Sequence, residues 1–252
     1  MTKDGRPSPL HDTRLFVGNG EAYSGKGISH FENYDALAFA LRLTWWLNGE
    51  GFSIGHTPAL YIYYSTDLPA GTIKAEAPRY TPDDWWFRQV KVGVPKGFPG
   101  ENALQDAADG LIAVLKALKP EDAAMIDRAA EIVTANGADC RFLLKVKDTA
   151  KQVIEISTTI GVFRQPSLLF VAMTDKATGT YREAPPASIQ SYDDGVYLAG
   201  KVKIARSGIE IAPRASYMAR LVVERNPDAA TWSMDEFVRA ERPVISGLLK
   251  FR

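Results

Sequence analysis

The sequence predicts an α+β protein: a mixed α/β N-terminal half with an αα-hairpin, then a mainly antiparallel β-sheet and a short C-terminal helix. Two observations indicate this class. Before residue 139, long stretches repeat apolar residues at helical spacing. From Cys140 onward, short segments alternate apolar and polar residues with brief links, as in antiparallel sheets. We expect two lobes, 1–139 and 140–252, with one continuous domain as the alternative.

The N-terminal lobe is expected to alternate between strands and helices. A serine followed three residues later by glutamate, Ser29 to Glu32, fits the capping box that opens a helix. Glycines at 49 and 51 follow the apolar stretch ALAFALRLTWWLN and are typical helix stops. The predicted elements, in order, are a strand at 13–19, a helix at 29–48, strands at 59–66 and 86–94, and a helical hairpin spanning 101–136.

The C-terminal lobe is expected to be a run of strands that ends in a helix. In residues 141–147, apolar side chains alternate with Arg141, Lys145 and Lys147, which predicts one apolar and one basic face. A second capping box, Ser233 to Glu236, predicts the last helix. The intervening predicted strands are 152–160, 167–174, 196–204, 209–211 and 217–223.

Charge and composition limit the function classes. The chain has 252 residues, 30 basic and 30 acidic, and a net charge of zero, which argues against non-specific capture of nucleic acid. Residues 1–139 carry 13 Lys and Arg against 18 Asp and Glu, whereas residues 140–225 carry 13 against 8. The polar N-terminus and the short apolar runs predict a soluble, cytoplasmic chain without a membrane span.

The stretch GFSIGH, Gly51 to His56, spells the G-x-S-x-G of a hydrolase nucleophile elbow. An elbow turns from a strand into a helix, but this stretch lies between a predicted helix and a predicted strand. Of the three histidines, only His56 follows Ser53, with no acid between them. We therefore interpret GFSIGH as a glycine-rich turn, and no catalytic residue is predicted.

The segment GEAYSGKG differs at one position from the sequence motif of a phosphate-binding loop. Gly20, Gly25 and Lys26 have the right spacing, but Gly27 stands where a hydroxyl coordinates Mg²⁺. A surface loop is the preferred interpretation, and anion or phosphate binding at these three residues is the alternative.

Metal and cofactor sites are not expected. Three scattered histidines and one cysteine give no zinc spacing. Cys140 is expected to be an inert, partly buried thiol, and one cysteine excludes an internal disulfide.

The aromatic residues are the most suggestive feature. Neighbouring side chains diverge by about 100° on a helix and point to opposite sides of a strand. One of Trp45 and Trp46, and one of Trp85 and Trp86, is therefore expected to reach the surface or a cleft, with a bulky aromatic core as the alternative. Exposed tryptophans are common anchors of binding surfaces. Lysines on the basic face would complement an acidic partner. The predicted partner-binding residues are Trp45, Trp46, Trp85, Trp86, Lys145, Lys147, Lys201 and Lys203.

These features favour a non-catalytic binding protein that recognises a protein partner, in the manner of an inhibitor or immunity protein. Two alternatives remain: an enzyme that uses carboxylates or the loop at Gly20 to Lys26, and a nucleic-acid binder that uses the basic sheet face. Tight binding of nucleic acid is not expected, because few aromatic residues accompany the lysines.

Overall fold

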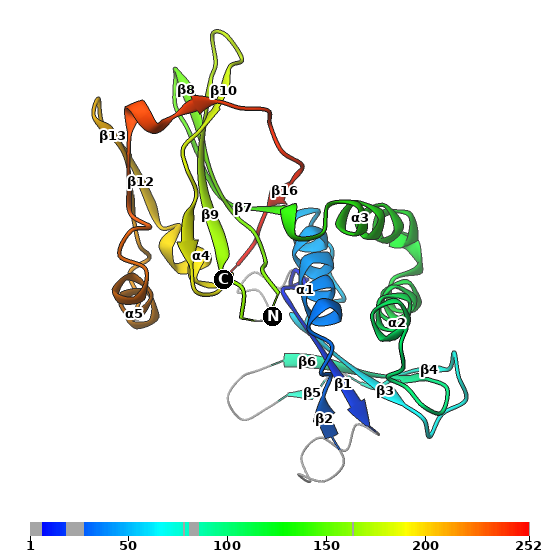
Figure 1. Ribbon diagram of the computed structural model, residues 1–252. Coiled ribbons are helices and arrows are strands. Elements are labelled where there is room, and N and C mark those ends of the chain that lie inside the picture. Colours follow the sequence, from blue (N-terminus) through cyan, green and yellow to red (C-terminus); the bar gives the residue numbers. More distant parts are fainter. Residues whose placement is uncertain (1–6, 19–27, 78, 81–85, 163, 252) are drawn as a thin grey trace. The chain divides into compact units, whose positions relative to one another are not determined.

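The computed structural model (Figure 1) describes residues 7–18, 28–77, 79–80, 86–162 and 164–251. Helices and strands both build the structure, which confirms the α+β class. The chain divides into two compact units, Met1–Gly137 and Ala138–Arg252. The predicted division into lobes 1–139 and 140–252, with one continuous domain as the alternative, stays a prediction. No helix within the described ranges is both long and apolar enough to cross a bilayer.

The sheet of the first unit has a parallel centre and antiparallel edges. The strands β1 (Asp12–Gly18), β3 (Ala59–Ser65) and β6 (Trp86–Gly93) run parallel in that order. The edge strands β2 (Ile28–His30), β4 (Ile73–Ala75) and β5 (Arg79–Tyr80) pair antiparallel with β1 or β6. Parallel neighbours need a crossover, and the helix α1 (Tyr34–Gly49) supplies it between β1 and β3.

Helix α1 begins later than the sequence predicted. Residues 28–30 pair with β1 as strand β2, so the expected capping box at Ser29 to Glu32 is wrong. Asn33 is the cap instead, and its side-chain oxygen accepts a hydrogen bond from the Ala36 amide at 3.0 Å. An asparagine in this position satisfies one of the free amides of the first turn.

The predicted αα-hairpin is confirmed. Helix α2 (Ala103–Leu118) and helix α3 (Ala123–Asn136) contact each other across the short 3₁₀ turn η1 (Pro120–Asp122). Each helix buries one stripe of residues and leaves the other side exposed, as amphipathic surface helices do. Both helices also pack on α1, which itself lies against β1.

A close contact between sheet and helices in this unit joins β3 to α2. The Tyr64 side chain is fully buried, and its hydroxyl donates a hydrogen bond to the Ala107 carbonyl at 2.6 Å. A Cβ atom at Gly110 would lie 2.7 Å from the Tyr64 ring. A glycine is therefore required in the middle of α2, where glycine is otherwise unfavourable.

We predict that Gly110→Ala destabilises the protein by about 1–3 kcal/mol, because overpacking against a fixed ring outweighs the gain in helix propensity. Urea unfolding would measure the change. Gln105→Ala, at an exposed position of the same helix, is the control and should leave stability nearly unchanged. A Gly110→Ala protein more stable than wild type would show that the ring moves aside freely.

The main sheet of the second unit is largely antiparallel, as predicted. Strands β7 (Arg141–Asp148), β8 (Gln152–Thr158) and β9 (Ser167–Asp175) form consecutive hairpins. The short strands β10 (Tyr181–Glu183) and β11 (Ala187–Ile189) both pair with β9. The edges are β15 (Val238–Arg239), beside β10, and β16 (Ile245–Leu248), which runs parallel to β7.

The predicted strand 217–223 is a helix, and the predicted strand 196–204 is helical at its start and extended only over 201–204. Residues 194–198 form α4 (Asp194–Leu198), and residues 217–225 form α5 (Tyr217–Arg225). Ser216 caps α5 by accepting a hydrogen bond from the Ala219 amide at 3.1 Å. The buried Asp194 carboxylate accepts hydrogen bonds from Arg225 and Asn226, so α4 and the end of α5 are held together by one charged group.

The remaining strands form a second sheet. The order is β12 (Lys201–Ile204), β13 (Gly208–Ala212) and β14 (Thr231–Ser233). Residues 141–148 and 201–204 therefore lie in different sheets.

The predicted C-terminal helix is wrong as well. The capping box at Ser233 does form, but it opens only the single 3₁₀ turn η3 (Met234–Glu236). Pairing of Val238 and Arg239 with β10 then takes the backbone hydrogen bonds that a longer helix would need.

Candidate functional site

One face of the seven-stranded sheet carries an unusual row of charge. Glu155 on β8 and Glu183 on β10 are both in register with Ala172 on β9, so their side chains point to the same side. Ala172 is small and leaves room between them. We call this side the network face; it also carries Arg141, Thr159, Leu168, Phe170, Thr174 and Tyr181.

Arg141 neutralises the first carboxylate. Its guanidinium binds Glu183 with two hydrogen bonds, Nη1 to Oε2 at 2.8 Å and Nη2 to Oε1 at 3.2 Å. The same group lies over the Phe170 ring, with the Arg141 Cζ atom 3.2 Å from the ring centroid. Only 14% of the Arg141 side chain and 15% of the Glu183 side chain are exposed. This is a bidentate, stacked arginine, a geometry that lysine cannot reproduce.

Arg242 neutralises the second carboxylate from a different part of the chain. Residues 240–244, which we call the strap, connect β15 at one edge of the sheet to β16 at the other. Within the strap, Arg242 Nη2 donates to Glu155 Oε1 at 2.6 Å, and the Arg242 Cζ atom is 5.9 Å from the Tyr181 ring centroid. The Glu155 side chain is 8% exposed. These contacts place the strap across the network face.

The length of the strap constrains the sheet. Going from Arg239 to Ile245 takes six residue steps, which reach about 21 Å when fully extended. Five strand-to-strand spacings in a flat sheet measure about 24 Å. The sheet therefore curves toward the strap, and the network face is concave.

Tyr181 completes the network. Its hydroxyl donates to Glu183 Oε2 at 2.9 Å. Burial raises the pKa of the Tyr181 hydroxyl far above its ordinary value, and the negative charge of Glu183 and their hydrogen bond raise it further. A tyrosine in this state keeps its proton and is a poor base or nucleophile. Because guanidinium groups bind both carboxylates, these side chains are suited to neutralise each other's charge and not to act as a catalytic acid or base.

The raised pKa of Tyr181 predicts a specific loss of stability at high pH. An unfolded tyrosine ionises near pH 10, while the folded protein keeps the Tyr181 proton. The stabilisation is thus complete below about pH 10 and falls as the pH rises toward the folded-state pKa. In urea unfolding between pH 9 and 11, wild type should lose more stability than Tyr181→Phe. Parallel curves for the two proteins would contradict the buried, Glu183-bound hydroxyl.

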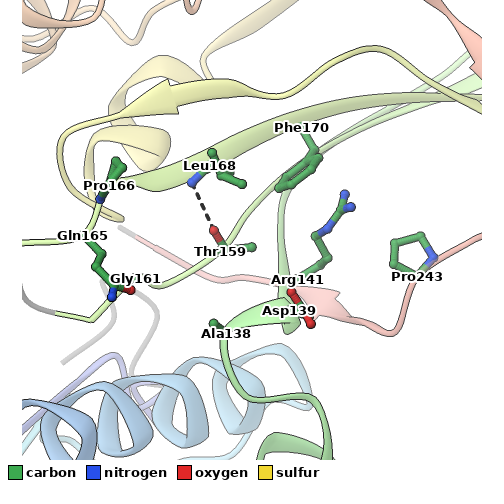
Figure 2. A pocket seen from close by; sticks show the side chains of 10 residues that line it. All are labelled: Ala138, Asp139, Arg141, Thr159, Gly161, Gln165, Pro166, Leu168, Phe170 and Pro243. Atoms are coloured by element: carbon green, nitrogen blue, oxygen red, sulfur yellow. Dashed lines mark hydrogen bonds between the residues drawn. The ribbon is translucent and has the colours of Figure 1, made fainter.

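A pocket opens at one end of the network face, where β7 and β9 begin and β8 ends (Figure 2). Its volume is about 330 Å³. Arg141 and Phe170 belong both to this pocket and to the network, and Pro243 of the strap lies on its wall. The other lining residues are Ala138, Asp139, Thr159, Gly161, Gln165, Pro166 and Leu168.

The predicted aromatic surface does not form where it was expected on α1. Trp45 and Trp46 are both buried, at 2% and 5% exposure, so neither reaches the surface. The physical reason is that α1 is covered on three sides, by β1, α2 and α3. Trp85 lies outside the described residues. Trp86 begins β6, and its side chain also lies outside the described part.

The predicted lysine surface is divided between two sheets. Lys145 and Lys147 on β7 are half-buried, and Lys147 Nζ donates to the Val202 carbonyl at 2.8 Å. Lys201 and Lys203 on β12 are exposed, and Lys203 forms an ion pair with Glu210 at 2.7 Å. An irregularity between residues 143 and 145 also interrupts the expected alternation along β7.

The other predicted sites are resolved in part. Gly20, Gly25 and Lys26 lie outside the described residues, so anion or phosphate binding at these three residues stays a prediction. Ser53 Oγ is within hydrogen-bond distance of the Ser8 carbonyl, at 2.6 Å, and of the Gly55 backbone, as expected for a turn.

The cysteine and the possible metal ligands offer little support for a reactive site. Cys140, the single cysteine of the sequence, is fully buried and forms no disulfide. Within the described ranges, no group of three or more His, Cys, Asp and Glu side chains is placed to hold a metal ion.

Helix α5 presents a surface that the sequence did not reveal. Ala219 and Val222 are buried on its inner side, and Tyr217 is 65% exposed on the opposite side. The Arg220 guanidinium lies 5.7 Å from the Tyr217 ring centroid. The apolar pattern of residues 217–223 predicted a strand, and this face was therefore not expected. The cap residue Ser216 and the three-residue spacing of Ala219 and Val222 are the signals that indicate a helix here.

No family model matches this chain, and no curated protein or solved structure is similar enough to count as a match.

Proposed function

We propose that this protein acts by binding a protein partner through the outward face of α5, without catalysis of its own. The observation that carries the proposal is the position of Tyr217 and Arg220. Tyr217 is the most exposed of the large hydrophobic side chains that the structure describes. Tyrosine and arginine are enriched among the residues that dominate binding energy at protein interfaces.

The helix that presents this face is firmly held. Asp194 binds Arg225 and Asn226, while Asn226 Oδ1 accepts a hydrogen bond from the Gln190 amide at 3.0 Å. Ser216 fixes the first turn. A rigid helix loses little conformational entropy on binding, so a large exposed tyrosine at its start is well suited to be an anchor.

Charge favours an acidic partner. Residues 138–252 carry 17 Lys and Arg against 13 Asp and Glu. Lys201 and Lys203 are exposed in the same unit, although Glu210 partly offsets Lys203. Solvent-exposed charges of this kind mainly accelerate encounter and help to select the partner, whereas buried anchors supply affinity. The proposal therefore assigns affinity to the α5 face and an electrostatic role to the lysines.

The test is quantitative affinity capture from the native cell extract with three proteins: wild type, Tyr217→Ser/Arg220→Ala, and Tyr34→Ser. Tyr34 is a matched control, because it is also the first residue of a helix and 46% exposed. A partner bound by wild type and by Tyr34→Ser should be weakened at least about tenfold by the double substitution.

The variants must first be shown to be folded by circular dichroism and thermal unfolding. Substitutions at exposed positions are expected to change stability by no more than about 0.5 kcal/mol. Capture that is equal for all three proteins, or the absence of any saturable partner, would count against the α5 face as the binding surface.

A further inference from the structure

We propose that the pocket beside the network face binds a free α-amino acid with an apolar side chain. This inference goes beyond the proposed function, since the pocket and α5 are different parts of the second unit. It rests on three groups that line one cavity: a guanidinium with spare donors, a carboxylate, and an apolar wall (Figure 2).

Arg141 is suited to receive the carboxylate of the ligand. An arginine has five N–H donors, and the two bonds to Glu183 use one donor on each terminal nitrogen. Three donors are left on a group that lines the pocket. Stacking on Phe170 fixes the plane of the guanidinium, so a carboxylate finds donors that are already oriented. Preorganised charge-assisted hydrogen bonds of this kind are stronger than those between neutral groups.

Asp139 is suited to receive the ammonium group. It closes the 3₁₀ turn η2 (Gly137–Asp139), directly before β7, and its side chain is exposed on the pocket wall. Among the described residues, none forms a hydrogen bond or ion pair with its carboxylate. Asp139 and Arg141 both line the pocket (Figure 2). An α-amino acid carries one ammonium and one carboxylate group, and so offers a partner of opposite charge to each of these residues.

The rest of the pocket suits a short apolar side chain. Leu168, Phe170 and Pro243 supply hydrocarbon surface, and Thr159 and Gln165 supply polar groups. A volume of about 330 Å³ is at the small end of ligand sites, which run from about 300 to 1,000 Å³. An amino acid the size of leucine fits within this volume.

Other small ligands match fewer of these groups. A phosphate or dicarboxylate would place its second charge against Asp139. A simple amine would leave the donors of Arg141 unused in a partly buried site, where unpaired polar groups are costly. A zwitterion satisfies both charged residues at once.

The experiment is isothermal titration calorimetry of the full-length protein with three probes: L-leucine, L-leucinamide and N-acetyl-L-leucine. L-leucinamide lacks the carboxylate, and N-acetyl-L-leucine lacks the ammonium group. We expect L-leucine to bind with a Kd below about 1 mM and each analogue to bind at least about tenfold more weakly.

Two variants locate the binding. Asp139→Asn should weaken L-leucine at least about tenfold and remove the preference over N-acetyl-L-leucine. Asp228→Asn is the control, because Asp228 is also an exposed aspartate of the second unit and is not part of the pocket. It should bind L-leucine as wild type does.

Three results would overturn the proposal. One is no heat of binding for L-leucine, or for L-phenylalanine as a larger apolar probe, at concentrations up to about 10 mM. Another is equal binding of L-leucine and its two analogues by wild type. The third is equal loss of binding in Asp139→Asn and Asp228→Asn. None of these results bears on partner capture through α5, so the two proposals fail separately.

Discussion

The second unit depends on compensating two carboxylates that share one row of a sheet. Glu155 and Glu183 flank Ala172 on the network face, and each is mostly shielded from water. Removing a carboxylate from water costs several kcal/mol unless charge and hydrogen bonds replace the solvent. Arg141 supplies the compensation from within the sheet, and Arg242 supplies it from the strap. Tyr181 adds a hydrogen bond and keeps its proton.

This requirement explains the course of the C-terminal segment. After the turn η3, the chain pairs with β10, crosses the network face as the strap, and pairs with β7 at the opposite edge. Arg242 is the contact that fixes the crossing, because Glu155 would otherwise remain a buried charge without a partner. The crossing places Pro243 over the end of the face, where it becomes a wall of the pocket. The pocket is thus a consequence of charge compensation and of the short strap.

The sequence predicted the elements whose pattern is local. The alternation of apolar and polar residues predicted β7, β8 and β9, and the apolar stripes predicted α2 and α3. It could not assign α4 and α5, because short apolar segments fit a strand or a helix equally well and the deciding contact, Asp194 with Arg225, spans 31 positions. The charge network could not be predicted for the same reason, since Arg242 and Glu155 are 87 positions apart. Burial of Trp45 and Trp46 depends on three neighbouring elements, although apolar residues on nearly every side of the helix already favoured a buried helix.

The most direct test of this account is a double-mutant cycle on Arg242 and Glu155, with urea unfolding of wild type, Arg242→Ala, Glu155→Gln and the double variant. Arg242 is half exposed, which moderates its effect, but its removal leaves Glu155 charged and buried. We expect a coupling free energy of about 1 kcal/mol or more, with Arg242→Ala much less harmful once Glu155 is glutamine. A coupling free energy below about 0.3 kcal/mol would contradict the claim that this pair holds the strap on the sheet.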